Sequence, residues 1–141
     1  MKKLLTLTVL SVFLAACTGF LVKEPDWIPA GPAFGPYNGA VDVVSDPKQI
    51  TKPYGNLGMA RLRGVPKNSK DIQNAVDTMT KFVAAKGATG MLIAQEAEGD
   101  GTTGTVMLVG YAIKYKDSVT PEDQKAIEQF KLIGVVDNYK K

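Results

Sequence analysis

The sequence predicts one small α+β domain, a two-layer sandwich with a mainly antiparallel sheet and the element order β-β-α-β-β-α. Three observations predict it. Apolar side chains recur at helical spacing between residues 69 and 86, residues 105–115 form a long apolar run typical of a strand, and 141 residues suffice for one domain of ordinary size. With 45% apolar residues and a formal net charge of +3, the composition is that of a globular protein.

The first 17 residues have the organisation of an export signal. Lys2 and Lys3 give a positive start, and an apolar run over residues 4–16 follows them. This run falls within the ~7–15 residues of a secretory signal and is shorter than the ~20 needed to cross a bilayer. We therefore expect residues 1–16 to be a signal peptide that takes no part in the fold.

The apolar run ends in Leu14-Ala15-Ala16-Cys17, which resembles the lipobox of bacterial lipoproteins. The resemblance implies that the Cys17 thiol is acylated, for example by palmitate, and that the chain is cut just before it. Acylation also removes a lone thiol that would be a liability in an oxidising compartment, and two or more acyl chains anchor a protein stably. The alternative is an ordinary signal peptide in which a cysteine follows two alanines by chance.

The same resemblance implies a location. In Gram-negative members of the family, the absence of aspartate directly after the cysteine implies sorting to the outer membrane, and Thr18 occupies that position here. We therefore expect a protein of the cell envelope that is held by its lipid anchor, with its domain facing the periplasm.

Composition excludes several classes of function. Lys2 and Lys3 belong to the signal, so the mature chain keeps 15 of the 17 basic side chains against 14 acidic ones, and this near-neutral balance does not predict nucleic-acid binding. The chain has no histidine and a single cysteine. Imidazole-based catalysis, histidine metal sites and an internal disulfide framework are therefore excluded, and no cofactor is expected.

Residues 17–39 are predicted to be the lipidated cysteine followed by a proline- and glycine-rich tether. Proline and glycine disfavour both helices and sheet pairing, and an extended segment of this kind would reach up to ~65 Å. Four large apolar or aromatic side chains interrupt it. They predict either packing on the domain or at the lipid surface, or a segment that binds a partner. These side chains are Trp27, Ile28, Phe34 and Tyr37.

The predicted domain spans residues 40–141, and its first half contains two strands and a helix. Residues 40–44 predict a short strand and residues 54–65 a second one, with Leu57 and Met59 on the same face and glycines that mark bulges. The helix begins after Asn68 or Ser69, and Gly87 stands just past its end. The bulge candidates are Gly55, Gly58 and Gly64.

The second half predicts a hairpin and a second helix. A strand that begins at Met91, a turn over residues 99–104 and the strand 105–115 form the hairpin. The strand 105–115 is apolar on both faces, which predicts that helices or another subunit, and hence a homo-oligomer, cover them. Thr120-Pro121 begins the second helix, and Gly134 is expected to stop it.

The helix that ends in Gly87-Ala88-Thr89-Gly90 before an apolar strand resembles small exported bacterial domains with a β-α-β-β core, over roughly residues 40–116. The lipobox and proline-rich segment also resemble the envelope-stress sensor lipoproteins of the Rcs pathway. Those sensors depend on disulfides, and this chain has no cysteine beyond Cys17. The resemblance therefore implies a fold more than a function.

Residues 96–104 offer two candidate binding sites. Residues 99–104 match G-x-G-x-x-G, but the loop runs into a strand rather than a helix, so we interpret it as a hairpin turn. Glu96, Glu98 and Asp100 alternate like the ligands of a calcium loop, but Met107 replaces the bidentate glutamate. A solvated strand end explains these acids, and a cation site of another kind is the alternative.

Three further groups of side chains have a structural and a functional interpretation. Ser69 and Lys70 are adjacent and point in different directions, so a helix cap explains the serine better than a catalytic dyad. A basic group is either a solvated strand face or a contact for anionic lipid or an acidic partner. Three tyrosines are either core or an aromatic binding patch. The basic group is Arg61, Arg63, Lys67 and Lys70, and the tyrosines are Tyr54, Tyr111 and Tyr115.

Together these features predict a membrane-anchored envelope lipoprotein that acts as a non-enzymatic structural or interaction module, with envelope proteins or the cell wall as its partners. The alternatives are a module that binds a small ligand or cation, and an envelope stress sensor. An enzyme ranks last, because no arrangement of catalytic residue types stands out in the sequence.

Overall fold

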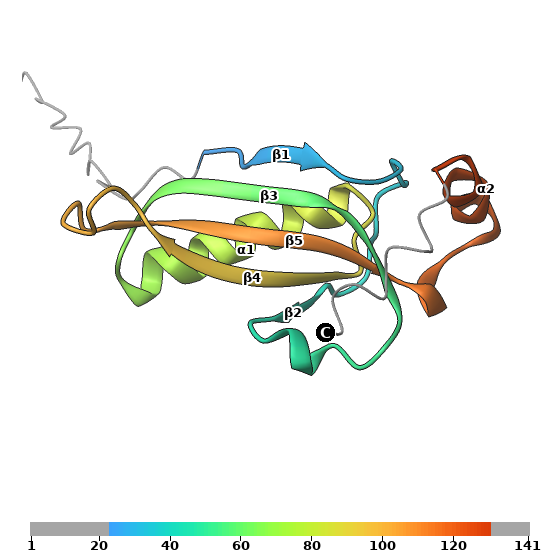
Figure 1. Cartoon of the computed structure of the whole chain (residues 1–141), viewed down its shortest axis with the longest axis horizontal. Coiled ribbons are helices and arrows are strands. Elements are labelled where there is room, and N and C mark those ends of the chain that lie inside the picture. The colour runs from blue at the N-terminus through green and yellow to red at the C-terminus, as the bar shows by residue number, and fades with distance from the viewer. Residues whose placement is uncertain (1–22, 131–141) are drawn as a thin grey trace, which may run out of the picture.

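The computed structural model describes residues 23–130 and shows one five-stranded sheet with strand order β1-β3-β5-β4-β2 (Figure 1). β1–β3, β3–β5 and β4–β5 pair antiparallel, whereas β2 and β4 pair parallel. The predicted α+β class is confirmed, but the sheet is mixed rather than mainly antiparallel. The elements are β1 (Asp26–Pro29), β2 (Asp42–Val44), β3 (Tyr54–Pro66), α1 (Ser69–Ala85), β4 (Gly90–Ala97), β5 (Thr105–Tyr115) and α2 (Pro121–Phe130), with 3-10 turns at Pro47–Gln49 and Lys116–Ser118.

The predicted element order is wrong at its start, because β1 lies inside the segment predicted as a tether. Trp27 pairs with Ala60 and Ile28 with Met59 along β3. An edge strand needs ladder hydrogen bonds on one side only, so a proline such as Pro29 is tolerated at its end. Trp27 also stacks edge-on against Phe82 of α1, with ring centroids 6.0 Å apart. This segment therefore packs on the domain, as one of the two interpretations of its aromatic residues predicted.

β1 and its tryptophan approach β3 closely at Gly58. A Cβ atom at Gly58 would lie 2.6 Å from the Ile28 carbonyl oxygen and 2.6 Å from the Trp27 ring. The Ile28 oxygen is backbone and cannot rotate away. A side chain at this position is therefore incompatible with the docked β1.

Gly58→Ala is expected to displace β1 and to lower the free energy of unfolding by about 1–3 kcal/mol. Trp27 is the only tryptophan of the chain, so its fluorescence reports β1 directly, and the emission should shift to the red. Gly55→Ala is the matched control, since a Cβ there meets nothing within 4 Å. Unchanged emission in Gly58→Ala would show that β1 docks differently.

β3 contains two irregularities, which coincide with two of the predicted bulge glycines. The register with β5 shifts between Asn56 and Gly58, and again between Leu62 and Val65 around Gly64. The first shift turns Leu57 to the same core as Ala60 and Leu62. The prediction that Leu57 shares a face with Met59 is therefore wrong, because strict alternation fails at a bulge.

The main core lies between α1 and one face of the sheet. Asn68 caps α1 by accepting a hydrogen bond from the Asp71 backbone N–H at 3.0 Å, which decides between the two predicted caps. The predicted apolar stripe is confirmed, since Met79 and Val83 are fully buried. They pack with residues of β3, β4 and β5, namely Leu57, Ala60, Leu62, Val65, Met91, Val106, Leu108 and Ala112.

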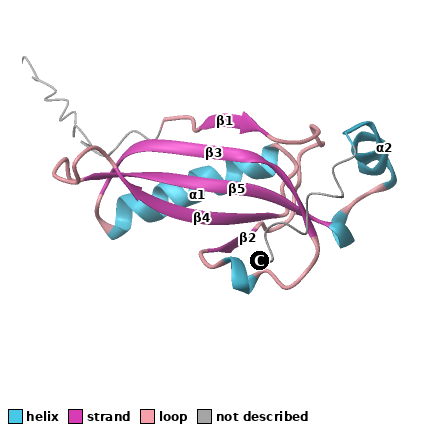
Figure 2. Ribbon diagram, viewed as in Figure 1, coloured by secondary structure: helices cyan, strands magenta, loops and turns pink. Residues whose placement is uncertain are grey.

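The two helices occupy different places, so the predicted two-layer sandwich is not confirmed. α1 runs along one face of the sheet, whereas α2 lies beyond the end of β5 (Figure 2). We call the face opposite α1 the open face. At its β2 end a second cluster of buried residues covers it, and this cluster comprises Val44, Ile50, Tyr54, Leu92, Ile113 and Tyr115. The predicted helix stop at Gly134 lies outside the described residues.

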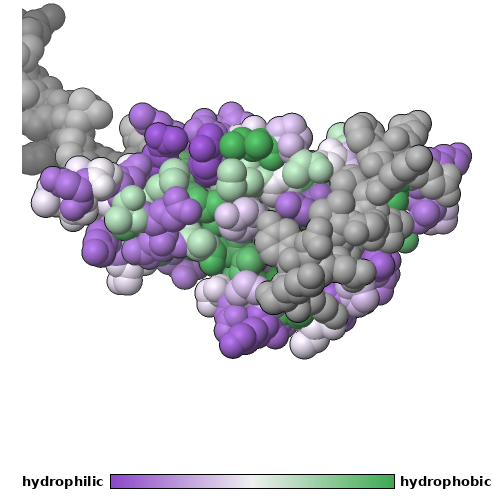
Figure 3. Space-filling model, viewed as in Figure 1, coloured by the Kyte–Doolittle hydropathy of each residue, from purple (hydrophilic) through white to green (hydrophobic). Residues whose placement is uncertain are grey.

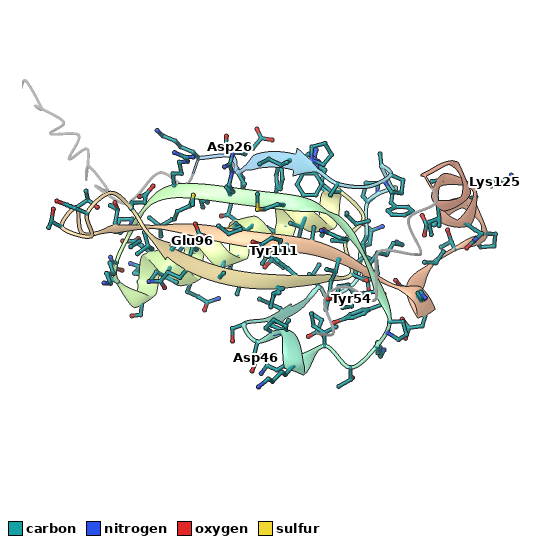
Figure 4. All side chains as sticks on the ribbon, viewed as in Figure 1. Asp26, Asp46, Tyr54, Glu96, Tyr111 and Lys125 are labelled. Atoms are coloured by element: carbon teal, nitrogen blue, oxygen red, sulfur yellow. The ribbon has the colours of Figure 1, made fainter. Side chains whose placement is uncertain are left out.

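The open face carries apolar side chains beyond this second cluster. Figure 3 views this face and shows apolar residues over the middle of the sheet, with polar ones around them. Figure 4 shows Tyr111 near its centre and Glu96 towards the hairpin. Ile28, from β1, is 40% exposed. Within the described residues α1 covers one face of β5 and neither helix lies over the other, so the alternative that another subunit covers the second face stays a prediction.

Within residues 23–130, neither helix has the length and apolar character that crossing a membrane requires.

Candidate functional site

Two adjoining cavities lie at the end of the sheet where β5 ends and α2 begins, and together we call them the end-of-sheet site. The first has a volume of about 370 Å³ and the second about 270 Å³. Tyr37 and Ser118 line both. The loop over residues 33–37, the end of β5 and the first turns of α2 enclose the first cavity, and Asp42, Lys52, Thr89, Tyr115 and Asp117 line the second.

Lys114 is the buried charge of the first cavity. It stands near the end of β5, and its side chain is only 7% exposed. Its ammonium donates a hydrogen bond to the Gly87 carbonyl oxygen at 3.2 Å, forms an ion pair with Asp123 at 3.2 Å, and lies 4.9 Å from the centre of the Phe34 ring. These contacts replace the water that burial removes, without which a buried ammonium is very unfavourable.

Asp123 connects Lys114 to the start of α2. Its carboxylate accepts a hydrogen bond from the Thr120 backbone N–H at 3.0 Å, and its own N–H donates to the Thr120 hydroxyl at 3.1 Å. This reciprocal pair is a capping box. Burial raises the pKa of Asp123, but the hydrogen bonds from Thr120 and Lys114 outweigh it, so the pKa is lowered overall. The ion pair thus fixes the first turn of α2 against the end of β5.

Tyr115 is the corresponding residue of the second cavity. Its hydroxyl donates a hydrogen bond to Asp42 at 2.7 Å, and its backbone N–H donates to the Thr89 hydroxyl at 2.9 Å. Burial and the bond to Asp42 raise its pKa well above the ordinary value. The phenol therefore stays protonated and acts as a donor. Nearby, Lys52 pairs with Asp117 at 2.8 Å, which raises the pKa of Lys52.

Tyr115→Phe is expected to lower the free energy of unfolding by about 1–2 kcal/mol, because the Asp42 carboxylate loses a charge-assisted hydrogen bond. The raised pKa also gives the wild type a pH dependence. The contribution of the phenol is complete below its unfolded pKa of about 10 and is lost as the pH rises through the folded value. Denaturation between pH 7 and 11 should show a loss that Tyr115→Phe lacks. Tyr111→Phe, on the open face, is the control and should follow the wild type.

The polar side chains of the end-of-sheet site are held by contacts within the protein. The Lys114 ammonium is held in an ion pair, and the Tyr115 phenol is held protonated, so neither is poised to act as a base or nucleophile. Fixed donors and acceptors beside the rings of Phe34 and Tyr37 instead offer a preformed surface for a polar ligand.

Two of the three acids predicted as a cation site take part in turn and strand contacts instead. Glu98 accepts a hydrogen bond from the Gly64 N–H at 2.8 Å, and Asp100 accepts one from the Thr102 N–H at 3.0 Å. Hydrogen bonds from Thr102 lower the pKa of Asp100. Glu96 is exposed on β4. Among residues 23–130 no group of three or more acids or cysteines could hold a metal ion, so the cation hypothesis gains no support from the geometry.

The hairpin turn and the tyrosines have the structural roles that the sequence favoured, whereas Ser69 does not cap α1, because Asn68 occupies the cap position. Residues 99–104 form the turn between β4 and β5, with positive φ at Gly99, Gly101 and Gly104. Tyr54 and Tyr115 are buried in the second cluster, against which Tyr111 packs. Ser69 is the first residue of α1, after its cap, with Lys67 and Lys70 exposed beside it, and Arg61 and Arg63 lie on β3. Cys17 lies outside the described residues.

Sequence reasoning missed Lys114, Asp123 and Asp42. One signal was present for Lys114, since it continues the buried alternation of Leu108 and Ala112 along β5. A lysine at such a position predicts a buried partner. The partner itself is nine residues further on, past a 3-10 turn, and its placement depends on how the chain folds back.

Comparison with known proteins finds distant structural similarity alone. No protein-family model and no curated protein matches this chain. A solved structure that matches is the crystal structure of FvfA, a Francisella virulence factor. The two chains share 21% identity, and the match covers 63% of this chain and 95% of FvfA with a TM-score of 0.44. Similarity at this level says nothing about function.

Proposed function

We propose that this protein is a lipid-anchored module of the bacterial cell envelope, which presents the end-of-sheet site to a partner or ligand and carries out no catalysis. The observation that carries the proposal is the sequence Leu14-Ala15-Ala16-Cys17 at the end of an export signal. Acylation at Cys17 would hold the mature chain at the membrane. The outer membrane is the proposed location, with the domain in the periplasm.

The position of β1 supports a short anchor. Only residues 18–25 separate Cys17 from β1, so the extended chain between them spans about 30 Å at most. This distance is less than half of the ~65 Å expected from a tether of 22 residues. The domain would stay close to the membrane surface.

Strand direction gives the anchored domain an orientation. β1 runs antiparallel to β3, so the chain enters the sheet from the side on which β3 ends at Pro66. β5 runs antiparallel to β3 as well, and its last residue, Tyr115, pairs with Tyr54 at the opposite end. The end-of-sheet site therefore lies at the end away from the anchor, facing the partners that the module would meet.

Incorporation of labelled palmitate by growing cells tests the anchor. Wild-type protein is expected to take up the label, and Cys17→Ser to lose it entirely, because the thiol is the acceptor of the first acyl chain. Thr18→Ser is the matched control and should be labelled as the wild type is. Wild-type protein that remains unlabelled, while other lipoproteins of the same cells are labelled, would contradict the proposal.

A further inference from the structure

The outer edge of β4 is only partly occupied by β2. β2 pairs with Gly90–Leu92, whereas residues 93–97 of β4 pair with β5 alone. Figure 1 shows β4 extending well beyond the end of β2. Within the described part of the chain, the backbone of these five residues therefore has a free side, which is a template for another strand.

This free edge has few of the features that normally prevent strand addition, and Glu96 is the one charged side chain on it. Edge strands are usually protected by lysine, proline or a bulge. Residues 93–97 read Ile-Ala-Gln-Glu-Ala, and their register with β5 continues without a shift. The side chains of residues 94–97 are exposed, and α1 packs on β3 and β5 rather than over this edge.

We propose that the free edge of β4 pairs antiparallel with the same edge of a second copy, about a two-fold axis at Gln95. Residues 93–97 are complementary to themselves in this register. Glu96 lies opposite Ala94 of the partner subunit, and Ile93 opposite Ala97 of the partner subunit, so each large or charged side chain meets a small neutral one. The two sheets become one continuous sheet, and each copy presents the same patch, as a two-fold interface requires.

β2 selects this register over its alternatives. It occupies the edge beside Gly90–Leu92, so a strand added to β4 can pair only from Ile93 onwards. In a two-fold arrangement the same limit applies to both copies. Shifting the axis towards Ile93 would drive one β4 into β2 of the partner subunit, and shifting it towards Ala97 would shorten the pairing. The longest pairing that both copies allow is therefore centred on Gln95.

Disulfide trapping tests this contact in the native full chain, purified in detergent. Gln95→Cys places two thiols directly opposite each other on the axis, within reach of a disulfide bond. Mild oxidation should give a covalent dimer. Gln124→Cys, an exposed glutamine on α2, is the matched control, carries the same Cys17, and should remain monomeric under the same conditions.

Sedimentation over a concentration series provides the second measurement. Gln95→Lys places two positive charges opposite each other and should weaken dimer formation by about tenfold or more, whereas Gln124→Lys should leave it unchanged. The proposal is overturned by a wild type that stays monomeric at every concentration. It is equally overturned by a dimer that Gln95→Lys does not weaken, or by trapping that is no stronger for Gln95→Cys than for the control.

Discussion

Lys114→Met is expected to lower the free energy of unfolding by about 3–5 kcal/mol, the largest effect of any single side chain described above. The substitution keeps the length of the side chain but leaves the Asp123 carboxylate, 12% exposed, without its cation. It also removes the donor to the Gly87 carbonyl oxygen and the ammonium beside Phe34. Chemical denaturation of the variant and the wild type measures the difference.

Two controls separate the buried ion pair from a general effect of losing a lysine. Lys52→Met removes the pair with Asp117, which is shorter at 2.8 Å but about 60% exposed on each side, so solvent screens it and the loss of stability should be much smaller than for Lys114→Met. Adding Asp123→Asn to Lys114→Met removes the carboxylate that has lost its cation. The double variant should therefore recover part of the free energy of unfolding. If Lys52→Met and Lys114→Met cost the same, Lys114 is not anchoring α2.

The same pair predicts how stability depends on acid. Because the folded pKa of Asp123 is lowered, its contribution is complete above the unfolded value of about 4 and is lost as the pH falls through the folded value. Lys114→Met removes one cause of the lowering, so the variant should lose less stability on acidification than the wild type.

Gly87→Ala is expected to have the second largest effect, with a loss of about 3 kcal/mol or more. Gly87 follows the last turn of α1 with φ +88°, where an L-residue is strained by about 1 kcal/mol. An alanine Cβ would also lie 2.5 Å from the Phe34 Cβ and 2.8 Å from the Gly35 carbonyl oxygen. The loop over residues 33–37 would have to move, and with it one wall of the end-of-sheet site.

Gly101→Ala isolates the contribution of backbone strain. Gly101 has a similar φ of +82°, but a Cβ there meets nothing within 4 Å. Thermal or chemical denaturation should therefore show a loss of about 1 kcal/mol for Gly101→Ala and several times that for Gly87→Ala. Equal losses would mean that the contact with Phe34 and Gly35 does not restrict Gly87.

The elements that the sequence predicted well are those whose signals are local. The stripe of Met79 and Val83, the cap at Asn68 and the glycine at 87 define α1 within a residue, and β5 has the predicted bounds. The turn over residues 99–104 follows from its glycines. In each case the residues that decide the structure lie within one element or directly beside it.

The features that the sequence did not predict depend on distant contacts. The proline-rich segment forms β1 because β3 offers an edge and Gly58 offers space for Trp27, and neither is visible within the segment itself. The parallel pairing of β2 with β4 depends likewise on a strand almost 50 residues away. The end-of-sheet site combines the loop over residues 33–37 with β5 and α2, so its pairs of charged residues could not be predicted by local spacing.

The most direct test of the proposed function is the intact mass of the native protein extracted from cell membranes. The account predicts a chain that begins at Cys17, without residues 1–16, and whose mass exceeds that of the polypeptide by two or more acyl chains. A chain that retains residues 1–16, or one cut elsewhere with an unmodified Cys17 thiol, would contradict it.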